Sequence, residues 1–209
     1  MTPRTIKVYS DYKSPYAYLA KDPAYDLARA TGVRLEWLPY TLDIPAYLGS
    51  ATLDAGGNVV EQSRNAHQWR RVKYSYMDCR REANRRSLTI RGPRKIFDST
   101  LANIGLLYAK RHGAFPAYHD RVFELFWKRE LDIENPDALA RVLAQCGADT
   151  KDFPAFLDSE GRRELQKIQQ EAEAAGVFGV PSYLLEDGDL YWGREHLPRI
   201  REQVTDARA

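Results

Sequence analysis

Residues 7–22 read KVYSDYKSPYAYLAKD, in which Ser14 stands directly before Pro15 where an alternating apolar stretch meets a helical pattern. Serine is a favoured N-cap residue and proline a favoured first helical residue, so this pair predicts a helix that begins at Pro15. The first amide groups of a helix lack intrahelical partners, and together with the helix dipole they stabilise negative charge. Ser14 therefore either caps a helix and nothing more, or also presents its hydroxyl to a reactive anion.

The elements around this serine predict a βαβ unit. Residues 5–10 and 33–38 alternate as strands do, and residues 15–30 have helical spacing, with a kink expected at Pro23 and a C-cap at Gly32. A strand, a helix and a strand in this order close right-handed around a parallel pair. The first strand then delivers the serine to the positive end of the helix.

A long helical stretch follows this unit. A turn-rich connection covers residues 39–57, and beyond it apolar residues recur at helical spacing. The helices predicted in this stretch are residues 67–84, 96–111, 117–129, 136–145 and 160–175. No repeat period links these segments, which indicates one insertion rather than a repeat array.

The β pattern returns near the C-terminus. Residues 182–185 and 190–192 are predicted strands joined by a hairpin turn, and residues 194–204 are a predicted closing helix. The order βαβ, helices, ββα predicts an α/β protein with a thioredoxin-like fold interrupted by a large all-helical insertion. The predicted domains are a discontinuous thioredoxin-like domain, residues 1–57 with 176–209, and a helical insertion domain, residues 58–175.

In a thioredoxin-like fold the loop before the third strand lies beside the start of the first helix. Val180-Pro181 occupies this loop, where the proline is typically cis in such folds. We therefore expect a cis bond here and a site formed jointly with Ser14.

Dithiol chemistry is excluded by the residues at the helix start. Ser14 and Ala17 occupy the two cysteine positions of the C-x-x-C motif found in disulfide oxidoreductases, and the two cysteines, Cys79 and Cys146, lie elsewhere. Without sulfur at these positions no mixed disulfide can form. A serine can instead donate a hydrogen bond to a thiolate that a cofactor brings in, and glutathione is the first candidate.

Two segments carry a family resemblance. SDYKSPYAYLA at residues 10–20 and GVFGVPSYLLEDGDLYWGREHL at residues 176–197 flank the helical insert. Together they resemble the DsbA-like superfamily, in the branch that contains 2-hydroxychromene-2-carboxylate isomerase and the kappa-class glutathione transferases. The resemblance covers nearly the whole chain in element order. It implies that Ser14 hydrogen-bonds the glutathione sulfur and that the Val180 backbone, before Pro181, pairs with the glutathione peptide as an added strand.

The resemblance also implies a reaction. In the isomerases of this branch the thiolate adds reversibly to a conjugated aromatic pyruvate, allows a bond to rotate, and leaves unchanged. We therefore expect a glutathione-dependent isomerase acting on an aromatic or conjugated α-keto acid. The alternatives are a kappa-class-like transferase, which consumes glutathione, and a non-catalytic DsbA-like binding protein that has lost its redox cysteines.

Two positions near the C-terminus depart from the family pattern. Arg194 and Glu195 stand where relatives commonly carry a Ser-Asp pair that holds the γ-glutamyl end of glutathione. Glu195 is expected to take the ammonium group and Arg194 a carboxylate. This departure favours the non-catalytic alternative.

Four further residues are candidates for roles around the thiolate. Lys13 adds a charge that would lower the thiolate pKa or bind a substrate carboxylate. Tyr12 or Tyr16 would act as a proton donor, although both also suit a core or rim position. Arg80 lies on a predicted helix whose pattern also fits a solvated amphipathic helix with no ligand. As a site residue it would contact an anionic substrate in a cleft between the domains.

Composition and residue spacing limit which partners, metal sites and compartments we expect. The 209 residues carry a net charge of +2 with 29% charged residues and no compact basic run, so we expect no nucleic-acid partner. No window approaches the ~18 apolar residues of a membrane span, and the four histidines lack metal-ligand spacing, so we expect neither a membrane partner nor a metal site. Two unpaired cysteines fit a reducing compartment, which predicts a cytoplasmic protein. Analogy with the family adds a homodimer.

Overall fold

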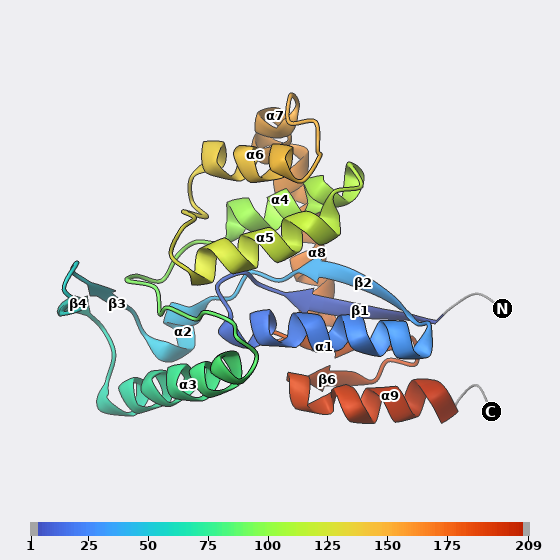
Figure 1. Ribbon diagram of the computed structural model, residues 1–209, viewed down its shortest axis with the longest axis horizontal. Coiled ribbons are helices and arrows are strands. Elements are labelled where there is room, and N and C mark those ends of the chain that lie inside the picture. The colour runs from blue at the N-terminus through green and yellow to red at the C-terminus, as the bar shows by residue number, and fades with distance from the viewer. Residues whose placement is uncertain (1–3, 207–209) are drawn as a thin grey trace.

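The computed structural model describes the backbone of residues 4–206 and the side chains of residues 4–205. Its centre is a four-stranded sheet with the strand order β2-β1-β5-β6 (Figure 1). The strands are β1 (Thr5–Ser10), β2 (Arg34–Pro39), β5 (Ser182–Leu184) and β6 (Leu190–Trp192). β1 pairs parallel with β2 and antiparallel with β5, which pairs antiparallel with β6. This mixed sheet confirms the thioredoxin-like fold.

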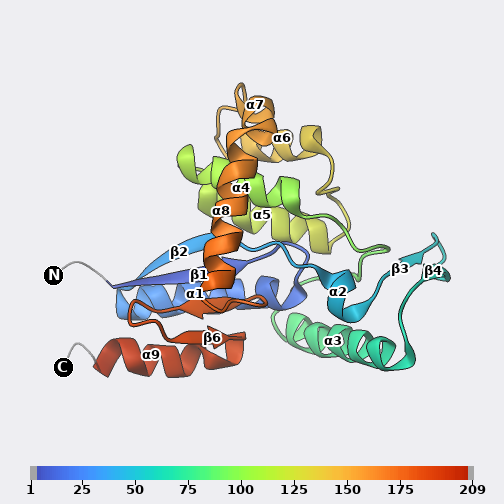
Figure 2. The same ribbon diagram turned by 180° about the vertical axis from the view of Figure 1, so that it is seen from behind.

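Helices cover both faces of the sheet. α1 (Pro15–Thr31) and α9 (Leu197–Asp206) lie side by side on one face. α4 (Thr100–Arg111), α5 (Phe115–Trp127) and α8 (Glu160–Ala174) lie on the other, and α8 crosses it as Figure 2 shows. The three-layer arrangement places the sheet between α1 and α9 on one face and the insertion helices on the other, and it buries the inner strand β1 more than the edge strand β6.

The alternation of β1 explains why two separate cores form. Ile6 and Val8 point to one face and join a cluster with Leu27 of α1 and Ile200 of α9. Tyr9 points to the opposite face and joins the larger cluster built by the insertion helices. Successive strand residues alternate between faces, so one six-residue strand serves both cores.

The remaining elements are α2 (Ile44–Leu48), the hairpin of β3 (Ala51–Leu53) and β4 (Val59–Gln62), α3 (Ala66–Arg85), α6 (Pro136–Gln145), α7 (Phe153–Asp158) and the 3₁₀ turn η1 (Arg194–His196). Of these, α6 and α7 lie at the top of Figure 1, α3 and the β3–β4 hairpin lie to its left, and η1 joins β6 to α9. No helix within residues 4–206 has the length and apolar composition that crossing a membrane requires.

Several short features differ from the sequence expectations. The segment predicted as a turn-rich connection, residues 39–57, contains α2 and begins the β3–β4 hairpin. All of β4 is exposed, so it carries no alternation to read. α7 was not predicted, because six residues are too few for a helical period, and α4 begins at Thr100 rather than at residue 96. Pro23 lies inside α1, which continues through it.

Candidate functional site

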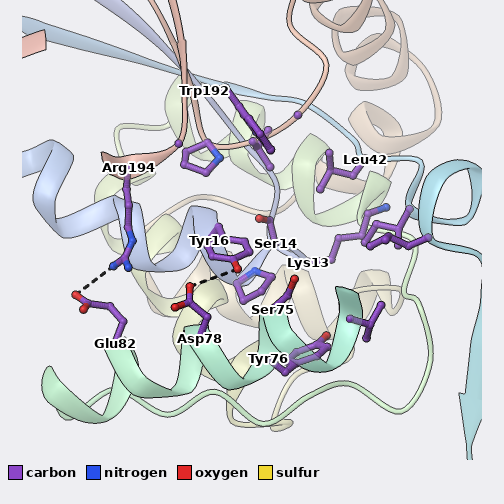
Figure 3. Close-up of a pocket in the computed structure, with 18 of the residues that line it drawn as sticks. Lys13, Ser14, Tyr16, Leu42, Ser75, Tyr76, Asp78, Glu82, Trp192 and Arg194 are labelled. Atoms are coloured by element: carbon purple, nitrogen blue, oxygen red, sulfur yellow. Dashed lines mark hydrogen bonds and ion pairs between the residues drawn. The ribbon is translucent and has the colours of Figure 1, made fainter. Parts of the chain in front are cut away.

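A large cleft lies between the thioredoxin-like domain and the helical insertion. Its volume is about 1810 Å³, and its walls are the start of α1, the loop before β5, η1, α3 and the loop at residues 92–97. Figure 3 shows Ser14 and Tyr16 on the α1 side facing Ser75 and Asp78 of α3. The two signals found at opposite ends of the sequence therefore meet in one place.

Ser14 is the N-cap of α1 and lines the cleft. Its Oγ accepts a hydrogen bond from the Ala17 amide at 3.2 Å, as a capping serine does. This bond uses the oxygen as acceptor and leaves the hydroxyl proton free to donate. The Tyr16 amide, also in the first turn, has no hydrogen-bond partner among residues 4–206. The helix start thus offers two donors to an anion.

The Val180–Pro181 peptide bond is cis, as expected. The antiparallel register pairs Tyr9 with Ser182, which places this bond beside the C-terminal end of β1 and hence near Ser14. Pro181 is held in place because its carbonyl accepts the Gly193 amide at 2.9 Å. In contrast, neither the amide nor the carbonyl of Val180 has a hydrogen-bond partner within residues 4–206. Buried main-chain groups are rarely left unpaired, so this pair of groups is suited to a ligand backbone.

Lys13 brings a cation to the cleft wall beside Ser14. Its side chain is buried, and its Nζ lies 3.8 Å from Oδ2 of the fully buried Asp11. The same Oδ2 accepts the Leu42 amide at 2.8 Å. Burial raises the pKa of the Asp11 carboxyl, and the charge of Lys13 and the Leu42 amide act against this rise. Asp11 therefore fixes where the ammonium lies while leaving its donors free for a ligand.

Tyr16 connects the two walls of the cleft. Its hydroxyl donates to Oδ2 of Asp78 at 3.4 Å, a long bond that a ligand oxygen could replace (Figure 3). Burial raises the pKa of Tyr16 to about 12, assisted by the nearby Cys79 and opposed by a hydrogen bond with Ser75. The phenol is consequently neutral near pH 7 and acts as a hydrogen-bond donor.

Tyr12, the other tyrosine expected near the site, does not line the cleft. It is 1% exposed, and its hydroxyl lies 3.2 Å from Nδ1 of the fully buried His119. Its ring packs against Phe123 and Tyr118 with centroids 4.8 and 6.1 Å away. The turn before α1 directs Tyr12 into the core of the insertion. Tyr12 therefore packs beneath the start of α1 and does not contact a ligand in the cleft.

The buried Tyr12–His119 pair predicts a pH-dependent stability. Burial lowers the pKa of His119 well below its usual value of 6.5, with Lys21 adding to the effect. The unfolded chain therefore takes up a proton below pH 6.5 that the folded chain does not, so stability is complete above that pH and falls below it. We expect a loss of up to about 1.4 kcal/mol per pH unit from this group.

The measurement is urea unfolding between pH 5 and pH 8 for the native protein, His119→Gln and the exposed control His67→Gln. The native protein and the control should lose stability more steeply toward acid than His119→Gln. Parallel curves for all three proteins would contradict the assignment.

Arg194 and Glu195 both line the cleft, but they differ in what they contact. Arg194 Nη1 lies 3.2 Å from Oε1 of Glu82, a residue of α3 that also pairs with Arg85 and Arg86 (Figure 3). Glu195 is exposed. The ion pair ties η1 to the insertion across the cleft, so a ligand carboxylate that binds Arg194 must compete with Glu82.

Two aromatic side chains at the cleft mouth were not identified from the sequence. Phe178 and Trp192 are 62% and 51% exposed, and their ring centroids lie 5.1 Å apart. Gly179 permits this contact, because a Cβ there would lie 2.8 Å from the indole Nε1 of Trp192. The sequence could have indicated Phe178, because it directly precedes the Gly-Val-Pro segment. The two rings give the cleft an apolar rim.

Comparisons with known proteins agree with this architecture. The family model described as DSBA-like thioredoxin domain matches residues 5–205. The 2-hydroxychromene-2-carboxylate isomerase of Sphingobium xenophagum is 28% identical over 204 residues, which cover 97% of this chain and 99% of that protein.

Solved structures show the same fold. A 2-hydroxychromene-2-carboxylate isomerase structure matches with a TM-score of 0.73 and 23% identity, over 97% of this chain and 95% of that one. The cytosolic disulfide reductase DsbM from Pseudomonas aeruginosa with GSH matches with a TM-score of 0.64 and 16% identity, over 98% of each chain. Because the family match spans nearly the whole chain, this protein belongs to the DSBA-like thioredoxin family.

Proposed function

We propose that this protein is a glutathione-dependent isomerase of an aromatic or conjugated α-keto acid. The observation that carries the proposal is the pairing, across one cleft, of the Ser14 hydroxyl at the start of α1 with the unpaired backbone groups of Val180. This is the arrangement that a small peptide thiol requires: donors for its sulfur on one side and a strand-like backbone on the other.

The residues around this pair fit glutathione. The Val180 amide and carbonyl would bind the peptide portion, and the Ser14 hydroxyl would donate to the sulfur. The free Tyr16 amide and the Lys13 ammonium would stabilise the sulfur as an anion. When bound, glutathione would supply a thiolate nucleophile that the protein itself lacks.

The chain's own thiols cannot take that role. Cys79 is fully buried, and burial raises the pKa of its thiol to about 12. Burial also raises the pKa of Cys146, which does not line the cleft. A protonated thiol is a poor nucleophile, so reactive sulfur has to come from outside.

Tyr16 is the chain's best-placed hydrogen-bond donor for the substrate. It is neutral near pH 7, lines the cleft two residues from Ser14, and donates to Asp78 of α3. In a cleft shielded from water, such a donor stabilises a carbonyl oxygen that gains negative charge. The protein would therefore hold the sulfur with Ser14 and the substrate oxygen with Tyr16.

Two similarities support the proposal. Relatives at about 28% identity are named 2-hydroxychromene-2-carboxylate isomerase, and the structure of the disulfide reductase DsbM contains GSH on the same fold. Glutathione dependence and a cytoplasmic location, where reduced glutathione is available, are part of the proposal.

The test is calorimetric titration of the protein with reduced glutathione, followed by turnover of a conjugated aryl α-keto acid. We expect binding that millimolar oxidised glutathione does not reproduce, and isomerisation during which the free-thiol concentration stays constant. A falling thiol concentration would instead identify a kappa-like transferase. Absence of any heat of binding at millimolar glutathione would remove both enzymatic functions and leave the non-catalytic alternative.

A further inference from the structure

Four arginines on the insertion side of the cleft lack acidic partners among residues 4–205, namely Arg64, Arg71, Arg80 and Arg129. The first three belong to or adjoin α3, and Arg129 follows α5. No carboxylate among residues 4–205 lies within 4.0 Å of any of the four guanidinium groups, although many other arginines of the chain form such pairs. The cleft wall therefore carries uncompensated positive charge at this place.

Arg80 and Arg129 converge on the backbone of Gly92. Nε of Arg129 donates to the Gly92 carbonyl at 2.8 Å, and Nη2 donates to the same oxygen. A Cβ on Gly92 would lie 3.6 Å from Nη2 of Arg80 and 3.5 Å from Cε1 of Tyr76. The guanidinium of Arg80 in turn lies over the Tyr76 ring, 5.6 Å from its centroid.

The backbone of Arg129 shows that its side chain is retained at a cost. Arg129 has φ of 62°, the left-handed conformation, and its amide closes the end of α5 by bonding to the Phe126 carbonyl. Glycine is the usual residue here, because side chains are unfavourable in this conformation. After α1, α4, α6 and α8 this chain does use glycine, namely Gly32, Gly113, Gly147 and Gly176. Of these five helix ends, only that of α5 has a charged residue in the left-handed conformation.

Tyr76 completes the cluster with a free hydroxyl. Its phenol oxygen has no hydrogen-bond partner among residues 4–205. Burial raises the pKa of Tyr76 to about 12, and the charges of Arg64, Arg80 and Arg129 oppose the rise. The phenol therefore stays protonated at neutral pH and can donate to an anion beside the two guanidinium groups.

We propose that Arg80, Arg129 and Tyr76 form a carboxylate-binding subsite that holds the acid group of the substrate. Arg80 presents planar paired donors that match a carboxylate, and Arg129 can add Nη1, which its bonds to Gly92 leave free. Tyr76 adds its hydroxyl as a further donor. Arg80 was expected to meet an anion, whereas the roles of Arg129 and Tyr76 emerge only from the fold. This subsite rests on the proposed function, because its ligand is the acid group of the proposed α-keto acid substrate. Ser14 would hold the glutathione sulfur at a separate place in the cleft.

The test measures binding of the acid without glutathione. A styryl α-keto acid and the methyl ketone of the same skeleton are titrated into the native protein, Arg80→Gln and Arg129→Gly. Arg81→Gln is the matched control, because Arg81 is the adjacent exposed residue of α3 and does not line the cleft. Loss of a charge-assisted hydrogen bond should weaken binding of the acid by about 10- to 100-fold in each cleft variant, and leave binding of the ketone unchanged.

Arg80→Gln separates ligand binding from structure. Arg129→Gly relieves the left-handed backbone but also removes the hydrogen bonds to the Gly92 carbonyl. The Arg80 side chain has no hydrogen-bond partner among residues 4–205, so Arg80→Gln should unfold as the native protein does yet bind the acid weakly. Equal binding of acid and ketone by the native protein, unchanged acid binding in both variants, or loss of it in Lys13→Met instead would overturn the subsite. Glutathione binding, titrated separately, should persist in all arginine variants, and its absence from the native protein would count against the proposed function and not against the subsite.

Discussion

Replacing Ser14 by alanine is expected to lower the glutathione-dependent rate about 100-fold at pH 7, with a smaller effect on glutathione binding. The Ser14 hydroxyl proton would donate to the glutathione sulfur, since its oxygen already accepts the Ala17 amide and the proton is left free. A donor aimed at developing or full negative charge contributes this magnitude. Its removal disfavours the thiolate, so the acid limb of the pH–rate profile should move to higher pH by about one unit or more.

Asn135→Ala is the matched control for this experiment. Asn135 caps α6 as Ser14 caps α1, accepting the Ala138 amide at 3.0 Å, but it does not line the cleft. Both substitutions remove one helix cap and should cost about 1 kcal/mol of stability. If the two variants lost activity equally, or if Ser14→Ala kept the native pH profile, Ser14 would be a capping residue alone.

The fold and the centre of the site could be predicted from sequence because their signals are local. Ser14-Pro15 predicts the start of a helix, and Val180-Pro181 predicts the start of a strand. The order of strands and helices around them permits few topologies. The observed β1–β5 pairing brings these two dipeptides together across some 165 residues of sequence without further information. The chemistry at the centre followed from residue type: no cysteine stands at either motif position.

Side-chain direction could not be predicted in the same way. Tyr12 and Tyr16 are four residues apart and look equivalent in the sequence, but Tyr12 precedes the helix and turns toward His119. Tyr16, in the first helical turn, faces α3. The difference arises from packing against the insertion helices, which lie far away in sequence. Arg129 illustrates the same limit, because its left-handed conformation depends on how α5 ends and not on its own preference.

The buried pair of Asp11 and Lys13 was also hidden from sequence reading, because an acidic and a basic residue two positions apart are common on surfaces. Here both are buried: the Asp11 side chain is fully buried and that of Lys13 is 6% exposed. Breaking such a pair by removing one member leaves an uncompensated charge in a poorly solvated place. The arrangement therefore matters more for stability than its 3.8 Å separation alone suggests.

Asp11→Ala should consequently destabilise the protein by about 3–5 kcal/mol at pH 7. It strands the Lys13 ammonium and removes the acceptor of the Leu42 amide, which anchors the chain after β2. Lys13→Met should cost less, because burial raises the pKa of Asp11 and its carboxyl can take up a proton when the ammonium is absent. The double variant should recover about 1–3 kcal/mol relative to Asp11→Ala.

Urea unfolding of the four proteins closes this double-mutant cycle, and glutathione titration of Lys13→Met adds a functional readout. If Asp11 acts by positioning the ammonium, both single variants should weaken glutathione binding, whereas the double variant should regain stability without regaining affinity. Such a split between recovered fold and unrecovered binding is what a cation aimed at the sulfur requires. A cycle without coupling, or affinity that returns together with stability, would instead make Lys13 a structural partner of Asp11 with no part in holding the thiolate.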